Sequence, residues 1–116
     1  MRSSDYIEKL DGYTFNEGFA HLISYRSMDI DRVDWHSKEL EDVFASSKKR
    51  MREALCETDR EKQKVLLYDA ICGRYYEKYA CMCGMLYLAR VWEKDGVAGL
   101  KREFSSFRGF AEKTLG

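Results

Sequence analysis

Apolar residues recur at spacings of three and four along most of this chain, and a strand-like alternation of apolar and polar residues persists nowhere. This periodicity predicts an all-α fold. No proline interrupts it, so long helices are allowed throughout the sequence. We expect one domain over residues 1–116, built as a small bundle of about four to five helices. The expected helices run from Ser4 to Gly12, from Thr14 to about Ser27, over about 31–57, over about 59–94, and from Val97 onwards.

A long antiparallel hairpin, made of the helices over 31–57 and 59–94, is the expected centre of this bundle. Between the two helices, the stretch TDRE begins at Thr58 and has the spacing of a capping box, which starts a new helix. Short connections favour antiparallel neighbours, so the two helices should pack side by side. No glycine marks the turn, and a continuous rod over 31–94 is therefore the alternative.

The stretch from Tyr79 to Ala89 is uncharged and apolar on every side of a helix. A helix of this kind is buried all round, so we expect it to be the central element, covered on two sides. One of its seams carries small residues, among them Cys81 and Gly84, which would let another helix backbone approach closely. The second covering helix comes either from the same chain or from a second copy.

The pair Cys81 and Cys83 is not expected to hold a metal ion. Residues two apart point about 200° from each other around a helix, so the two thiols face opposite sides. We interpret them as small buried residues and expect free thiols without a bound cofactor. If the hairpin turns near Thr58, however, His36 and Cys81 lie level with each other. They would then form half of a tetrahedral zinc site, and a metal- or cofactor-binding bundle is the third functional hypothesis.

A run of basic residues ends the helix expected over 31–57. Lys48, Lys49, Arg50 and Arg52 are candidate contacts for a nucleic acid or another anionic partner. Against this interpretation, the chain has 20 basic and 20 acidic residues, without the basic excess of most nucleic-acid-binding proteins. The helix macrodipole by itself favours basic residues at a helix end. Nucleic-acid association is therefore the second hypothesis.

The sequence indicates neither a membrane protein nor an enzyme. Its longest uncharged run, from Tyr79 to Ala89, has eleven residues and is too short to span a bilayer of about 30 Å. The first twelve residues lack the hydrophobic region of a secretory signal. No catalytic motif or glycine-rich phosphate loop is present. We expect a soluble, cytoplasmic protein without catalytic activity.

Aromatic residues supply the first functional hypothesis. They make up 14% of the chain, and Trp35, Tyr76, Tyr87 and Trp92 fall outside the main apolar seams. Tyrosine and tryptophan are enriched at binding hot spots. The alternative is that these four side chains cover the second side of the central helix. We expect a protein-binding module, acting as a stand-alone regulator or inhibitor through an aromatic helical face. A homodimer is the alternative form of the same hypothesis.

Overall fold

The computed structural model describes residues 4–116, with Ser27 described by its backbone alone. The predicted all-α bundle is confirmed, since the described residues contain helices and no strand. None of the helices within residues 4–116 combines the length and the apolar character that a membrane span requires. In chain order the elements are α1 Ser4–Ser24, η1 Tyr25–Ser27, η2 Ile30–Arg32, α2 Lys38–Cys56, α3 Arg60–Ile71, η3 Tyr75–Glu77, α4 Tyr79–Glu103 and α5 Phe110–Lys113, where η marks a short 3-10 helix.

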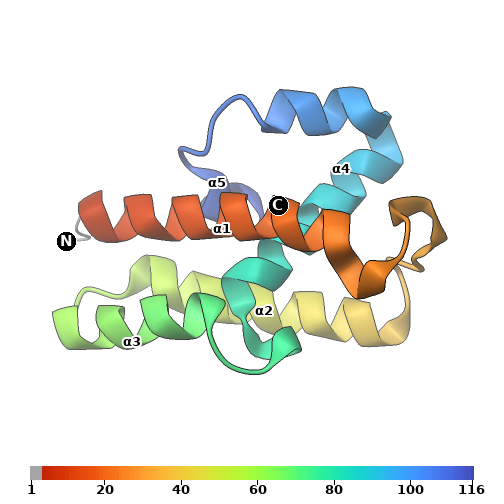
Figure 1. Ribbon diagram of the computed structural model, residues 1–116. Helices are drawn as coiled ribbons and strands as arrows, with labels where there is room; N and C mark the ends of the chain where they lie inside the picture. Colours follow the sequence, from red (N-terminus) through yellow and green to blue (C-terminus); the bar gives the residue numbers. More distant parts are fainter. Residues whose placement is uncertain (1–3) are drawn as a thin grey trace.

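Helix α4 passes through the middle of the molecule and packs against α1, α2 and α3 (Figure 1). From Tyr79 to Ala89 every residue except Tyr87 is buried. The prediction that this stretch is the central element is therefore confirmed. Its coverings belong to the chain itself, with α1 on one side and the α2–α3 pair on the other (Figure 1).

Two glycines allow α1 and α4 to meet backbone to backbone. A Cβ added at Gly84 would lie 2.2 Å from the carbonyl oxygen of Thr14 and 2.7 Å from the Cα of Gly18. No side chain fits at such distances, so glycine is required at this crossing. The expectation that small residues on one seam of α4 admit a close neighbour is confirmed at Gly84.

The two helices expected at the N-terminus are one helix, α1, so the predicted break at Gly12 is wrong. Thr14 does not cap a new helix. Its hydroxyl instead donates to the carbonyl oxygen of Leu10, one turn earlier, at 2.7 Å. A glycine inside a helix costs about 1 kcal/mol, and the burial of the surrounding face of α1 against α4 offsets that cost.

The helix expected over 31–57 begins later, as α2, because Ser37 caps it. The Ser37 hydroxyl oxygen accepts a hydrogen bond from the Leu40 N–H at 3.3 Å. The preceding residues form 3-10 turns and extended backbone around Trp35, which is only 3% exposed. The Trp35 indole N–H donates to the Ile30 carbonyl oxygen at 2.9 Å. Burial of this ring holds the segment in a compact turn where periodicity alone predicted a helix.

The helix expected over 59–94 is two helices, α3 and α4, separated by a loop and the short helix η3. Gly73 in this loop has a φ of 109°, in a region that an L-residue helix cannot continue through. The antiparallel hairpin therefore consists of α2 and the much shorter α3. Asp59 begins α3, with its carboxylate accepting from the Lys62 N–H at 3.0 Å. The alternative rod over 31–94 is wrong.

The predicted helix stop at Gly96 is confirmed as a sharp kink within α4. Gly96 has φ 65° and ψ −153°, which redirects the chain. The segment 97–103 then runs back alongside α1 (Figure 1). Rings from both segments meet there, since Phe104 lies 5.4 Å from Phe15 and 5.1 Å from Phe19 between ring centroids.

A buried carboxylate ties the C-terminal turn to α1. Asp11 is 5% exposed. Its two oxygens accept hydrogen bonds from the backbone N–H groups of Gly109 at 2.9 Å and Ala111 at 3.0 Å. Helix α5 has four residues and is far too short to be stable alone, so this cap and the burial of Phe110 hold it in place.

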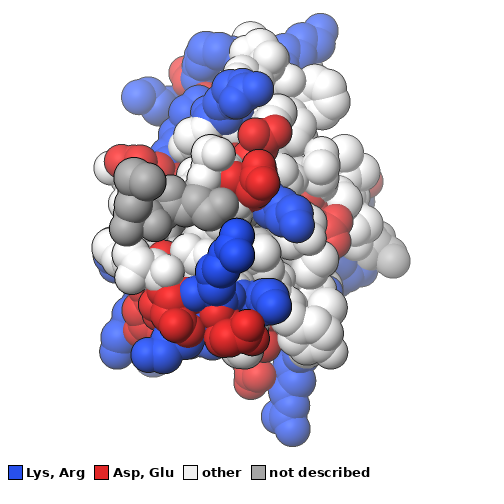
Figure 2. All heavy atoms as spheres, turned by 90° about the vertical axis from the view of Figure 1, so that its left-hand side faces the viewer, with Lys and Arg blue, Asp and Glu red and all other residues white. Residues whose placement is uncertain are grey.

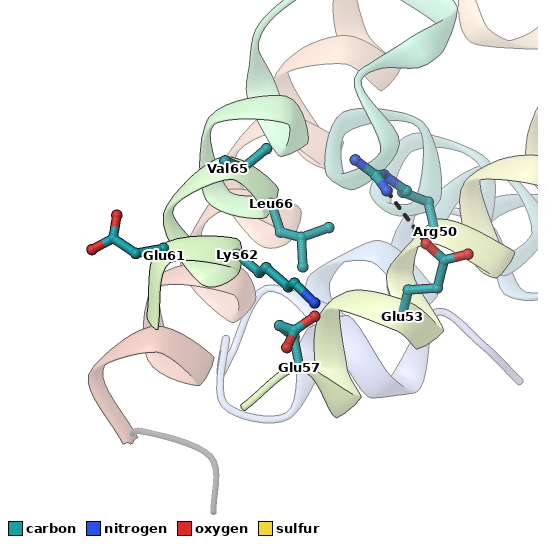
Figure 3. Close-up of a pocket in the computed structure, with 7 residues that line it drawn as sticks. All are labelled: Arg50, Glu53, Glu57, Glu61, Lys62, Val65 and Leu66. Atoms are coloured by element: carbon teal, nitrogen blue, oxygen red, sulfur yellow. Dashed lines mark hydrogen bonds and ion pairs between the residues drawn. The ribbon is translucent and has the colours of Figure 1, made fainter. Parts of the chain in front are cut away.

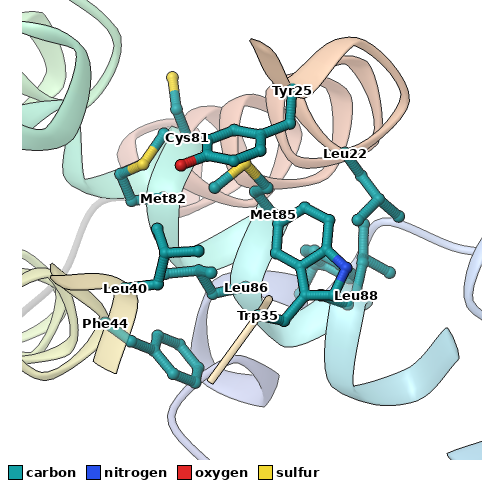
Figure 4. Packing of buried hydrophobic residues seen from close by; sticks show 12 residues of the cluster. Leu22, Tyr25, Trp35, Leu40, Phe44, Cys81, Met82, Met85, Leu86 and Leu88 are labelled. Carbon is teal, nitrogen blue, oxygen red and sulfur yellow. The ribbon is translucent and has the colours of Figure 1, made fainter. Parts of the chain in front are cut away.

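The buried side chains form two clusters on the two sides of α4. Figure 4 shows the first, in which residues of α4 meet Leu22, Tyr25, Trp35 and Phe44. The second lies between α1, α2, α3 and the start of α4. Cys81 belongs to the first cluster and Cys83 to the second. The prediction that these two thiols face opposite sides is confirmed.

Candidate functional site

The segment after the Gly96 kink and the end of α1 enclose an apolar groove of about 440 Å³. Four of the seven large hydrophobic residues that are exposed among the described residues lie in it, including Ile23 at 77%, Val97 at 61% and Phe104 at 63%. The groove is lined by Phe19, Leu22, Ile23, Met28, Asp29, Ile30, Trp92, Val97, Leu100, Lys101 and Phe104.

The walls of the apolar groove stand on rigid elements. Phe15 and Phe19 of α1 pack edge to face at 5.2 Å between centroids, and both rings contact Phe104. Leu22, also on α1, is fully buried and anchors the end of that helix in the first core cluster. An exposed apolar surface held by a packed base is typical of an interaction site.

The four aromatic residues singled out in the sequence do not form one face. Trp92 is partly buried and lines the apolar groove. Trp35 is a core residue, so its ring is not available to a partner. Tyr76 also packs against the core, and its hydroxyl hydrogen-bonds the Tyr25 hydroxyl at 2.6 Å. Trp35 and Tyr76 therefore cover the central helix, which was the alternative interpretation of these residues.

Tyr87 lies on another side of α4, away from the apolar groove. Its ring packs edge to face on Phe110 at 5.6 Å between centroids. It lines a charged hollow of about 620 Å³ together with side chains such as Arg102 and Glu103. Burial raises the pKa of Tyr87 to about 12, with the nearby Glu103 carboxylate adding to the effect. The Tyr87 ring thus packs between α4 and Phe110 of α5.

The four basic residues of α2 do not form one patch either. Lys48 lies over the Phe44 ring, at 4.3 Å from its centroid, while Lys49 and Arg52 are exposed. Arg50 lies at the opposite side of the helix, paired with Glu53 at 3.3 Å and with Asp69 at 2.9 Å. Arg52 stands three residues after Lys49 and four after Lys48, so these three share one face of α2, and Arg50 alone points away from it.

The pocket around Arg50 is acidic. Glu53, Glu57 and Glu61 line a hollow of about 340 Å³ between α2 and α3 together with Arg50 and Lys62, and Figure 3 shows Glu53 beside Arg50 and Glu57 beside Lys62. Three carboxylates against two basic groups do not attract a phosphate. On the face seen in Figure 2, basic and acidic side chains are interspersed as well. The acidic lining of this hollow does not favour a nucleic-acid contact at Arg50.

His36 and Cys81, expected to be level neighbours, are engaged elsewhere. The His36 ring lies between two carboxylates, with Nε2 at 2.8 Å from Glu93 and Nδ1 at 3.3 Å from Glu41. The hydrogen bond to Glu93 and the charge of that carboxylate raise the pKa of His36. The expected pairing depended on two long hairpin arms, and the loop that separates α3 from α4 removes that register.

Cys81 instead faces the other histidine. One ligand atom each of Glu17, His21 and Cys81 lie within 4.8 Å of one another, the one such group of three among the described residues. Sequence reasoning missed this group, although Glu17 and His21 stand one turn apart on α1. The missing information was the crossing at Gly84, which places the start of α4 on that turn.

Burial makes the Cys81 and Cys83 thiols poorly suited to nucleophilic attack. Burial raises the pKa of Cys81 and of Cys83 to about 12, so both are protonated at neutral pH when no metal is bound. Cys81 donates weakly to the Ala70 carbonyl oxygen at 3.7 Å. Cys56 is the exposed cysteine, and all four cysteines are free thiols.

No protein-family model, curated protein or solved structure matches this chain. The functional assignment therefore depends on the geometry of the apolar groove and of the side-chain clusters described above.

Proposed function

We propose that the protein binds an amphipathic helix of a partner protein in the apolar groove. The observation that carries this proposal is the gathering of Ile23, Met28, Val97 and Phe104, all exposed, around one hollow. Exposed hydrophobic side chains are usually scattered singly over a surface. A contiguous group in a concave site is a typical protein-interaction surface.

A helical ligand suits the shape and chemistry of the groove. Its two long walls are themselves helical, formed by the end of α1 and the segment 97–103. The lining is almost entirely apolar, so it offers few partners to the free backbone groups of an extended peptide. A helix satisfies its own backbone hydrogen bonds and would present apolar residues at spacings of three and four to the groove.

Two charges at the groove fix the expected orientation of the ligand. Asp29 and Lys101 are the charged residues in the lining, with Asp29 directly before η2 and Lys101 on the segment 97–103. A ligand helix with a basic residue near Asp29 and an acidic residue near Lys101 would be favoured in one direction. Such rim charges contribute more to orientation and association rate than to affinity.

The biological role that fits this surface is that of a small regulator or inhibitor without catalytic activity, in the cytoplasm. The protein would act by binding a helix of its target in the apolar groove. Of the four aromatic residues that fall outside the main apolar seams, Trp92 is the one that lines the groove and would contact the ligand. A single tryptophan at the centre of an interface is a frequent hot spot.

A matched pair of variants tests the proposal. Val97→Asp puts a carboxylate into the groove, and Val65→Asp makes the same change at a similarly exposed position on α3. The probe is a phage-displayed library of amphipathic helical peptides, selected against the full chain. We expect enriched peptides to bind the unchanged protein and Val65→Asp equally. Val97→Asp should weaken binding by at least about tenfold, because it puts a hydrated carboxylate where the apolar face of the ligand must pack.

Three results would contradict this function. The library yields no binder, or the enriched peptides bind Val97→Asp as well as the unchanged protein, or the groove is closed by a second copy. Light scattering at increasing concentration detects the last case. A dimer that Val97→Asp abolishes and Val65→Asp preserves would identify a second copy as the occupant in place of a partner helix.

A further inference from the structure

We propose that Glu17, His21 and Cys81 form a binding site for Zn²⁺, independent of the apolar groove. Glu17 and His21 stand four residues apart on α1 and therefore share one face of that helix. Cys81 lies in the first turn of α4, where the helices cross. The structure thus brings a carboxylate, an imidazole and a thiol together from two helices.

The distances suit a small tetrahedral ion. The three ligand atoms lie within 4.8 Å of one another. Zinc bonds of about 2.0–2.3 Å in a tetrahedral site place neighbouring ligand atoms about 3.3–3.7 Å apart. The ligand atoms must therefore approach by up to about 1 Å, which rotation of the partly buried Glu17 side chain can supply in large part while His21 keeps its backbone hydrogen bond. Cys81 is fixed in the core, and Figure 4 shows its sulfur pointing away from the centre of the first cluster.

The His21 ring is already oriented as in a metal-binding histidine. Its Nδ1 lies 2.7 Å from the backbone carbonyl oxygen of Glu17. A carbonyl only accepts hydrogen bonds, so Nδ1 carries the proton and Nε2 presents its lone pair. A backbone hydrogen bond on one ring nitrogen that leaves the other free is the usual arrangement behind metal-ligating histidines.

Lys78 competes with the ion for this lone pair. Its ammonium group lies 3.4 Å from Nε2 of His21 and 5.0 Å from the centre of the Tyr75 ring. When the ion binds, the ammonium group must leave the nitrogen, because two cations would repel each other there. The Tyr75 ring and solvent offer it other positions. Lys78 thereby sets the affinity of the site without being a ligand.

The mixed donor set points to Zn²⁺ among divalent ions. A thiolate disfavours Mg²⁺ and Ca²⁺, which take oxygen ligands, while one sulfur, one nitrogen and one oxygen are ordinary zinc ligands. Binding replaces the thiol proton of Cys81, which passes to solvent, so one proton is released per ion. Three protein ligands leave one coordination position for water or for a ligand from outside.

Titration of the metal-free full chain with Co²⁺ and Zn²⁺ tests the site. Co²⁺ bound to a thiolate gives charge-transfer absorption, and Zn²⁺ affinity is measured by competition with a fluorescent chelator. We expect one ion per chain, displacement of Co²⁺ by Zn²⁺, and a Kd tighter than about 10 µM. His21→Gln and Glu17→Gln should weaken Zn²⁺ binding by at least about tenfold. Lys78→Met should strengthen it by about threefold or more.

Two controls separate the site from chance binding. His36→Gln and Cys56→Ser remove the other histidine and the exposed thiol, and should leave Zn²⁺ affinity unchanged. Cys81→Ala should abolish the charge-transfer absorption. If that variant fails to fold, His21→Gln and Glu17→Gln decide the matter, since both positions are partly exposed. No absorption with Co²⁺, or equal affinity in His21→Gln and the unchanged protein, would overturn the proposal.

Discussion

The crossing of α1 and α4 predicts opposite effects for the same substitution at two glycines. Gly84→Ala adds a methyl group where only 2.2 Å separate it from the Thr14 carbonyl oxygen and 2.7 Å from the Gly18 Cα. Gly12→Ala adds the same methyl group to α1, with no atom within 4 Å. Both residues are inside helices, so the intrinsic helix preference changes equally at both sites.

The expected magnitudes follow from these distances. Ordinary contact begins at about 3.4 Å, so Gly84→Ala must separate two helix backbones by about 1 Å. Overpacking of this kind costs about 3 kcal/mol, because no flexible side chain can give way. The higher helix preference of alanine offsets about 1 kcal/mol of this cost, so the free energy of unfolding should fall by about 2 kcal/mol. Gly12→Ala should gain about 0.5–1 kcal/mol.

Urea denaturation followed by far-ultraviolet circular dichroism measures both effects. We expect the two variants to differ by about 3 kcal/mol in the free energy of unfolding, with similar m-values. Gly18→Ala meets the same backbone and should also destabilise. The double variant with Gly84→Ala should lose less than the sum of the single losses, because one separation relieves both clashes. A neutral or stabilised Gly84→Ala would refute the close crossing and the cluster geometry that follows from it.

Three further outcomes are expected. Asp11→Ala should lower the free energy of unfolding by about 2 kcal/mol in urea, since it leaves two backbone amides uncapped, while the exposed Asp5→Ala should change it by less than about 0.5 kcal/mol. His36 has a raised pKa, so its contribution is complete below its ordinary pKa of about 6.5 and is lost as the pH rises past the raised value. His36→Gln should therefore cost up to about 1 kcal/mol near pH 5.5 and nothing at pH well above neutral; an equal cost at both would contradict the ion pair. A thiol reagent should modify Cys56 in the folded protein and reach Cys83 only after unfolding; rapid native labelling of Cys83 would contradict its burial.

Apolar periodicity was sufficient to predict the class of fold and its central element. The stretch from Tyr79 to Ala89 is apolar on every side, and burial on every side is the only stable outcome for such a helix. The opposite directions of Cys81 and Cys83 follow from helix geometry alone. These features depend on residues close together in the sequence, where spacing determines direction.

Features that depend on tertiary packing could not be predicted in this way. Trp35 lies outside the expected apolar seam, so periodicity left open whether it contacts a partner or covers the central helix; its segment leaves the helix and buries the ring. The continuation of α1 through Gly12 depends on α4, which packs against it from far along the chain. The sequence signals near Gly73 did not reveal the break between α3 and α4. This break removes the register that would have paired His36 with Cys81.

The apolar groove shows the same distinction. Both of its walls were visible in the sequence as apolar stripes, one with Phe19 and Ile23 and the other with Val97 and Phe104. What the sequence could not supply is the direction of the chain after Gly96. The kink returns the second stripe to the first and leaves their outer edges uncovered, which creates the groove.

Methyl chemical-shift mapping by nuclear magnetic resonance tests the proposed docking surface most directly. A peptide enriched from the helical library is titrated into the labelled chain, and the methyl signals of Ile23, Val97 and Val65 are followed. We predict saturable shifts at Ile23 and Val97, which lie in the apolar groove, and unchanged signals at Val65 on α3. Shifts at Val65 with none at Ile23 and Val97 would contradict the proposal that this groove receives the partner helix.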